Sequence, residues 1–142
     1  MARDVMMSVD ELNDFLAEVF PQVSADYRIE RVAPMEADVR LLTNEQHLRP
    51  GGTVSGPTMF ALADLAMYAV ALAMIGREAL MVTTNASIDF MRKPEAGRDM
   101  IGRARLLKLG RSLVVGDVMI HSEGMEAPVA RAGMTYSIPP KR

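Results

Sequence analysis

Apolar and polar residues alternate one by one through residues 81–91, which is the period of a half-buried β-strand. Residues 100–109, 112–121 and 128–138 predict three more strands, and a short turn containing a glycine separates each segment from the next. Because such closely spaced turns favour antiparallel hairpins, the second half of the chain is predicted to form a four-strand meander.

The first half combines a short helix with two strands. Ser8 and Glu11 have the spacing of a capping box, and apolar residues then recur at helical intervals, so a helix is predicted over about residues 9–20. Two strands are predicted over residues 27–32 and 36–43, on either side of a turn that contains a proline.

A helix is predicted between these two parts, over residues 57–75. It has apolar side chains on every side, so we expect other structure to wrap around it. Pro57 suits the first helical position because it lacks an N–H that would have no acceptor there, so Gly56 is the predicted N-cap. Gly76 is the predicted end of the helix, in a left-handed conformation. The helix is near the lower length limit for a membrane span, but Asp64 within it and the strands after it favour a buried helix, with no membrane as a partner.

The order of these elements predicts an α+β fold. In it, a curved antiparallel β-sheet wraps around one long central helix, with a short helix at the N-terminus. This arrangement is the hotdog fold. The length fits a single domain over residues 1–142, and no linker or repeat divides the chain.

Composition narrows the function. Hydrophobic residues make up 49% of the chain and charged residues 24%, as in a globular protein, and the net charge of −2 gives no reason to expect nucleic acid as a partner. The chain has no cysteine and two histidines, so no metal site is expected. Acidic residues near the N-terminus stand where a signal peptide would be apolar, which predicts a cytoplasmic protein.

The candidate chemistry centres on Asp64, a single carboxylate inside the apolar helix. No lysine or arginine lies three or four positions away to pair with it, and a carboxylate in such surroundings is more often poised for chemistry than for stability. An ordinary solvated helix residue is the alternative. Gly56 lies at the start of the same helix, where free N–H groups and the helix dipole can hold a developing oxyanion.

The spacing of Gly56 and Asp64 predicts a dimer. They are eight residues apart, or about 12 Å along the helix axis, whereas both groups must lie about 3 Å from one reacting carbonyl. Two antiparallel copies of the helix, related by a two-fold axis, can bring Asp64 of one chain toward Gly56 of the other.

The sequence also resembles a known family. Residues 52–57, GTVSGP, followed by Asp64, are similar to the G-T-x-H-G-G motif and the later acid of hotdog acyl-CoA thioesterases of the phenylacetate-pathway (PaaI-like) type. Residues 82–94 are similar to their strand of the form V-T-x-x-x-x-x-x-F-x-R-x-P, and residues 109–112 resemble their next hairpin. The likeness covers roughly residues 40–138.

The resemblance implies a thioesterase that needs no cofactor besides the coenzyme A of its substrate. Asp64 would attack the thioester carbonyl or activate a water, Gly56 would donate to the oxyanion, and Thr83 would orient the water or the carboxylate from the facing subunit. Strand parity leaves Thr83 and Thr84 both open, although the seven-residue spacing to Phe90 favours Thr83. The implied assembly is a homodimer with shared active sites, in turn a dimer of dimers.

Three positions depart from the family pattern. Ser55 replaces its histidine, Pro57 replaces the following glycine, and Arg49 stands at the position of its upstream asparagine. Arg49 can contact a substrate carbonyl or carboxylate, or be a surface charge. Hydrolysis stays the expected reaction because Asp64 and Gly56 match the pattern, although the three changes together lower the activity expected on a standard substrate.

Basic residues are concentrated between positions 92 and 111, where seven of them stand against two acids. They indicate either a solvated strand face or a landing site for the phosphates of coenzyme A, for which Lys108 and Arg111 are the best candidates. No aromatic residue within this stretch could stack on a nucleic-acid base. The predicted substrate-binding residues are Arg49, Ser55, Thr84, Arg92, Lys93, Lys108, Arg111 and Ser112.

The expected reaction is hydrolysis of a small or medium acyl- or aryl-CoA thioester to the free acid and coenzyme A. Two alternatives stay open. His47 faintly resembles the histidine with which hotdog enoyl- or hydroxyacyl-CoA hydratases and dehydratases abstract a proton, although the rest of their motif is missing. The second alternative is a non-catalytic module that binds acyl-CoA.

Overall fold

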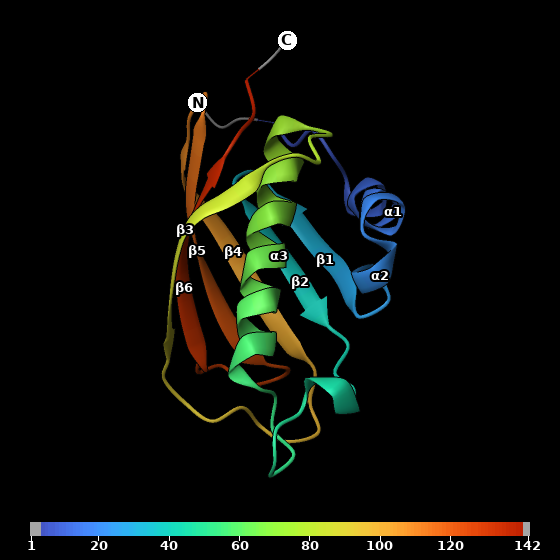
Figure 1. Cartoon of the computed structure of the whole chain (residues 1–142), viewed down its shortest axis with the longest axis vertical. Helices are drawn as coiled ribbons and strands as arrows, with labels where there is room; N and C mark the ends of the chain where they lie inside the picture. The colour runs from blue at the N-terminus through green and yellow to red at the C-terminus, as the bar shows by residue number, and fades with distance from the viewer. Residues whose placement is uncertain (1–3, 141–142) are drawn as a thin grey trace.

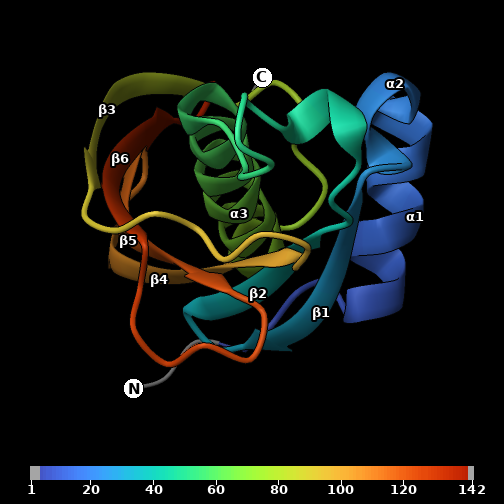
Figure 2. The ribbon, with the colours of Figure 1, turned by 90° about the horizontal axis from the view of Figure 1, so that it is seen from below.

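The computed structural model describes residues 4–140, which form one antiparallel sheet curled around a long helix (Figures 1 and 2). The helices are α1 (Val9–Val19), α2 (Pro21–Ser24) and α3 (Gly56–Ile75), with a short 3-10 turn η1 (Glu45–His47). The strands are β1 (Tyr27–Ala33), β2 (Glu36–Leu41), β3 (Val82–Phe90), β4 (Met100–Leu109), β5 (Leu113–Ser122) and β6 (Ala130–Ser137). Helix α3 packs on the concave face of the sheet, and α1 and α2 lie beside β1 (Figure 2). The predicted hotdog fold is confirmed.

The order of the strands differs from the predicted meander. The sheet runs β1-β2-β4-β5-β6-β3, so β4, β5 and β6 form a three-strand meander, while β3 lies at the far edge and, within residues 4–140, pairs with β6 alone. The vacant side of β4 is taken by β2. Alternation along a strand specifies which side chains face the core, but it does not specify the neighbouring strand, so the predicted hairpin between β3 and β4 was wrong.

One edge of the sheet is covered by a helix, and the other edge is exposed. At the β1 edge, the side-chain amide of Asn13 in α1 accepts from the Ile29 N–H at 2.9 Å and donates to the Ile29 carbonyl at 3.1 Å. Helix α1 therefore covers this edge and blocks further pairing there. At the other edge, every residue of β3 except Ile88 is exposed, including Val82 and Phe90, which are 57% and 53% exposed.

The N-cap of α3 is Ser55, one residue before the predicted cap. Its hydroxyl accepts the Thr58 N–H at 3.3 Å, which a glycine cap cannot do, so Gly56 becomes the first helical residue and Pro57 the second. The other two predicted helix signals are confirmed. Ser8 and Glu11 form a capping box, and α3 ends before Gly76, whose φ of 91° favours glycine.

The apolar composition of α3 predicts a helix that is wrapped on all sides, but in the structure one part of it is uncovered. By length and hydropathy it could cross a membrane, but 67% of its most apolar 18-residue window is buried inside the protein, as expected of a core helix. The uncovered part is a stripe on its N-terminal half. Pro57, Phe60 and Ala61 are exposed there, and Asp64 is half-buried. This stripe lies alongside the open strand β3, because Gly56 and Asp64 contact residues of that strand.

Candidate active site

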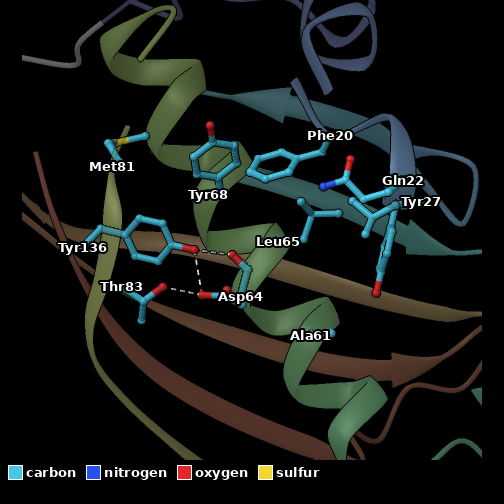
Figure 3. Close-up of a pocket in the computed structure, with 11 residues that line it drawn as sticks. Phe20, Gln22, Tyr27, Ala61, Asp64, Leu65, Tyr68, Met81, Thr83 and Tyr136 are labelled. Carbon is cyan, nitrogen blue, oxygen red and sulfur yellow. Dashed lines mark hydrogen bonds between the residues drawn. The ribbon is translucent and has the colours of Figure 1, made fainter. Parts of the chain in front are cut away.

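Asp64 is held by two hydroxyl groups that come from the sheet (Figure 3). Its Oδ1 atom accepts from the Thr83 hydroxyl of β3 and from the Tyr136 hydroxyl of β6, each at 2.7 Å. Within residues 4–140, no lysine, arginine or histidine forms an ion pair with it. The carboxylate is therefore oriented by neutral donors and is not neutralised by a cation.

A β-bulge decides which threonine reaches the site. Thr83 lies opposite Tyr136 and Asn85 lies opposite Thr135, so Thr84 is an extra residue in β3. The bulge turns the Thr83 side chain toward α3, although strict alternation would place Thr83 on the other face of the strand. The Thr84 hydroxyl donates instead to the Thr135 carbonyl at 3.3 Å. The resemblance implies that Thr83 orients the water or the carboxylate from the facing subunit, and in the structure it donates to Asp64 of its own chain.

Tyr136 is a site residue that the sequence did not reveal. It is 3% exposed, and burial, followed by the charge of Asp64, raises the pKa of its hydroxyl well above the ordinary value. At neutral pH it is therefore a hydrogen-bond donor to the carboxylate. It lies 72 positions from Asp64 along the chain, and no local pattern links the two residues.

Gly56 presents a free N–H at the start of α3. Pro57 has no N–H, and the Thr58 N–H is bonded to Ser55, so the Gly56 N–H is the donor left open among the first three helical residues; no acceptor for it occurs within residues 4–140. A Cβ atom on Gly56 would lie 3.3 Å from Phe90 Cζ. Ser55, a predicted substrate contact, is engaged as the cap and donates to the Thr58 hydroxyl at 2.8 Å.

The two candidate groups line different cavities of the chain. Asp64 lies on the wall of a cavity of about 340 Å³. Its other lining residues are mainly apolar or aromatic: Phe20, Gln22, Val23, Tyr27, Ala61, Leu65, Tyr68, Met81, Thr83 and Tyr136 (Figure 3). Gly56 lies in a second cavity of about 530 Å³, together with Arg49, Phe90, Arg92 and Lys93. A single chain thus keeps the carboxylate and the oxyanion donor apart, as their spacing on the helix requires.

The basic residues do not form one patch within a chain. Arg92 and Lys93 follow β3 at the end where Phe90 pairs with Ala130, and the Arg92 guanidinium donates to the Pro128 carbonyl at 2.6 Å. Lys108, Arg111 and Ser112 lie at the β4–β5 hairpin, at the other end of the sheet, where Leu113 pairs with Ser137. Arg103 and Arg105 border a separate charged hollow.

His47 has no free ring nitrogen. Its Nδ1 atom accepts from the Asn44 N–H at 3.0 Å, and its Nε2 atom lies 3.2 Å from the Asp26 carboxylate. The ring is 8% exposed and stabilises the η1 turn. This geometry argues against His47 as the base of a hydratase. In the part of the chain that the structure describes, no three acidic or histidine side chains are grouped to hold a metal ion.

The curved sheet around one helix, with a hydroxyl-held carboxylate at mid-helix, defines a hotdog-fold enzyme of the thioesterase type. The chain belongs to the thioesterase superfamily, whose family model matches residues 51–129, and it is a thioester hydrolase. The predicted family is confirmed.

Solved structures agree with this assignment. A proposed thioesterase from Silicibacter sp. TM1040 is 61% identical, with 99% of this chain and 97% of that one covered and a TM-score of 0.92. A mutant of the phenylacetic acid degradation protein PaaI from Thermus thermophilus is 28% identical, with 84% and 99% covered and a TM-score of 0.71. Zebra fish thioesterase superfamily member 2, 21% identical with 94% and 99% covered and a TM-score of 0.81, shares the fold. No curated protein matches the chain by sequence.

Proposed function

We propose that the protein hydrolyses a small or medium acyl- or aryl-CoA thioester to the free acid and coenzyme A, in active sites shared between two copies of the chain. The observation that carries the proposal is the Asp64 carboxylate, which is oriented by two hydroxyl groups on the wall of a largely apolar cavity of about 340 Å³. A cavity of this size and lining suits a compact acyl or aryl group. A thioester whose acyl group occupied this cavity would bring its carbonyl near the carboxylate.

In the proposed reaction, Asp64 takes a proton from a water molecule, whose oxygen adds to the thioester carbonyl carbon. The carbonyl oxygen becomes an oxyanion and accepts a hydrogen bond from the Gly56 N–H of the second copy. The oxyanion then re-forms the carbonyl, the C–S bond breaks, and the departing thiolate takes the proton back from Asp64. Direct attack by Asp64 would instead form a mixed anhydride that water must cleave, and it requires the same carboxylate.

The open edge of the sheet supports a dimer. Strand β3 leaves one side of its backbone unpaired and exposes apolar side chains, and natural proteins seldom leave such an edge uncovered. The opposite edge is closed by Asn13, so β3 is the edge available for pairing. The exposed stripe of α3 beside it would be covered by the same contact.

The positions of the site groups along β3 support a shared site. Asp64 lies beside Thr83 near one end of the strand, and Gly56 lies beside Phe90 at the other end. If two β3 strands pair antiparallel about a two-fold axis at the middle of the strand, Thr83 of one copy comes to face Phe90 of the other. The carboxylate of one copy then lies next to the free N–H of the other, and each dimer contains two sites.

The same pairing would gather the basic residues. Lys108 and Arg111 lie at the Thr83 end of the sheet, and Arg92 and Lys93 lie at the Phe90 end. Antiparallel pairing brings Lys108 and Arg111 of one copy to the same end of the joined sheet as Arg92 and Lys93 of the other. Arg49 lines the same cavity as Arg92 and Lys93. Such a group of cations is suited to the phosphates of coenzyme A.

The test is an assay of the purified protein with a panel of acyl-CoA substrates and a thiol reagent. We expect release of coenzyme A, and a loss of at least about 100-fold in Asp64→Asn, the scale of one general base. His47→Asn separates the alternatives when hydration of an enoyl-CoA is also followed, because a hydratase would lose that activity in this variant and keep it in Asp64→Asn. Tight binding of coenzyme A without any release would show a binding module and overturn the proposal.

A further inference from the structure

The Tyr136 hydroxyl lies within hydrogen-bond distance of two oxygen atoms of Asp64. It lies 2.7 Å from Asp64 Oδ1 and also 2.7 Å from the Asp64 main-chain carbonyl oxygen (Figure 3). Its single proton can serve one acceptor at a time, and the charged carboxylate oxygen is the stronger acceptor. The hydroxyl therefore holds the Asp64 carboxylate in one position relative to the α3 backbone.

Both donors converge on the same oxygen. Thr83 donates to Oδ1 at 2.7 Å from the β3 side, and Tyr136 donates to it from the β6 side. Among the described residues, none donates a hydrogen bond to Oδ2. A carboxylate held in this way cannot rotate freely about its Cβ–Cγ bond, and one oxygen is occupied while the other stays open.

We propose that Tyr136 is a positioning residue for hydrolysis: together with Thr83 it holds Oδ1 of Asp64 and reserves Oδ2 as the oxygen that acts on water or thioester. This inference rests on the proposed function. The β-bulge at Thr84 contributes to this arrangement, because without the extra residue the Thr83 side chain would point away from Asp64. A carboxylate fixed before the substrate arrives need not be ordered during the reaction.

The role of the hydroxyl can be separated from the role of the ring. Tyr68 lines the same cavity, its ring lies 6.2 Å from that of Tyr136, and it is 5% exposed. Its hydroxyl donates to the Ala79 carbonyl at 3.1 Å and does not contact Asp64. Tyr68→Phe therefore removes a comparable hydroxyl from the cavity without touching the carboxylate, and it is the matched comparison for Tyr136→Phe.

The experiment measures kcat and KM with one acyl-CoA substrate, together with thermal unfolding. In Tyr136→Phe we expect kcat to fall about 10- to 100-fold, the scale of a hydrogen bond to a charged group, while KM changes less than about twofold. Tyr68→Phe alters the cavity wall but not the contact with the carboxylate, so we expect its kcat to fall much less than that of Tyr136→Phe, with its main effect on KM. Thr83→Val should lower kcat as Tyr136→Phe does, and Thr83→Ser, which restores the hydroxyl, should recover most of it.

Three results would overturn the inference. The first is an equal loss of kcat in the two tyrosine variants. The second is a loss in Tyr136→Phe that appears in KM or follows a lower unfolding temperature, since a merely structural role would act in that way. The third is full activity in Tyr136→Phe while Asp64→Asn is inactive, which would leave the proposed function standing and remove the positioning role. Hydrolysis that persists in Asp64→Asn would refute the catalytic role of Asp64 and with it the positioning role of Tyr136, whereas the absence of coenzyme A release by the unaltered protein would refute the proposed function itself.

Discussion

Replacing Gly56 with proline should remove one N–H from the proposed site, and the Cβ atom that it adds before Pro57 is shared by an alanine control. Ser55 has φ −76° and ψ 157°, the extended conformation that a residue before proline adopts. Proline is also tolerated in the first turn of a helix, where its missing N–H has no intrahelical acceptor. The substitution therefore tests the oxyanion donor directly.

The first turn of α3 has no donor to replace the lost one. Pro57 lacks an N–H and the Thr58 N–H is bonded to Ser55 at 3.3 Å, so the loss is not compensated within this turn. Removal of one oxyanion donor costs about 100- to 1,000-fold in kcat, or about 2.7–4 kcal/mol. We expect Gly56→Pro to lower kcat by this factor with little change in KM, because the donor acts on charge that develops in the transition state.

Gly56→Ala is the matched control. It keeps the N–H and adds the same Cβ atom, 3.3 Å from Phe90 Cζ, and the Phe90 side chain is exposed enough to yield. Both variants are compared by release of coenzyme A and by thermal unfolding. Equal kcat values in the proline and alanine variants would refute the role of the Gly56 N–H.

Mixing two inactive variants tests the shared site. In a hybrid dimer of Gly56→Pro and Asp64→Asn chains, one site would combine an intact carboxylate with an intact N–H, and the other would lack both. With random pairing, about half of the dimers are hybrids, so the unfractionated mixture should regain about a quarter of the wild-type activity and the purified hybrids about half. Differently tagged chains, expressed together and purified through both tags, would measure this. If each chain held its own complete site, the hybrid would stay inactive.

Two further predictions concern the acyl cavity and acid stability. The Phe20 ring lies on the cavity wall, where it packs edge-on against the Tyr68 ring with 5.6 Å between the ring centroids. Because Phe20→Ala would enlarge the cavity, it should shift the preferred acyl chain to greater length. Each added methylene is worth about 0.8 kcal/mol, or roughly fourfold in kcat/KM. A series of acyl-CoA chain lengths measures this, Phe20→Leu is the volume control, and an unchanged optimum would contradict it. Arg40 contacts the carboxylates of Glu30, Asp99 and Glu123, and its hydrogen bond to Glu30 lowers the pKa of that carboxyl group. The interaction between Arg40 and Glu30 therefore stabilises the fold above the ordinary pKa of Glu30, and this stabilisation is lost as the pH falls through the lowered pKa. Arg40→Gln should therefore reduce the free energy of unfolding by about 1–2 kcal/mol near pH 7 and by much less near pH 3; equal differences in denaturant unfolding at the two pH values would argue against this.

Local patterns in the sequence were sufficient to predict α1, α3, the six strands and one half of the site, but they did not predict α2, which begins at Pro21, or the η1 turn. Period-two alternation predicted the strands, the box at Ser8 and Glu11 predicted the start of α1, and Gly76 predicted the end of α3. These signals are short-range, since each depends on residues within one or two turns or along one strand. The separation of Gly56 and Asp64 also followed from the sequence, because the rise of a helix is constant.

The neighbours of each element were decided by the tertiary structure alone. Alternation assigns side chains to a face of a strand but leaves the adjacent strand open, so β3 could pair with β6 at the far edge. The bulge that turns Thr83 toward Asp64 reverses the parity that the sequence shows. Tyr136 reaches the carboxylate only because β6 lies next to β3 and beneath α3. The sequence by itself thus determined which residue carries the charge and how far it stands from the helix start, whereas the packing of the sheet decided what holds that charge in place.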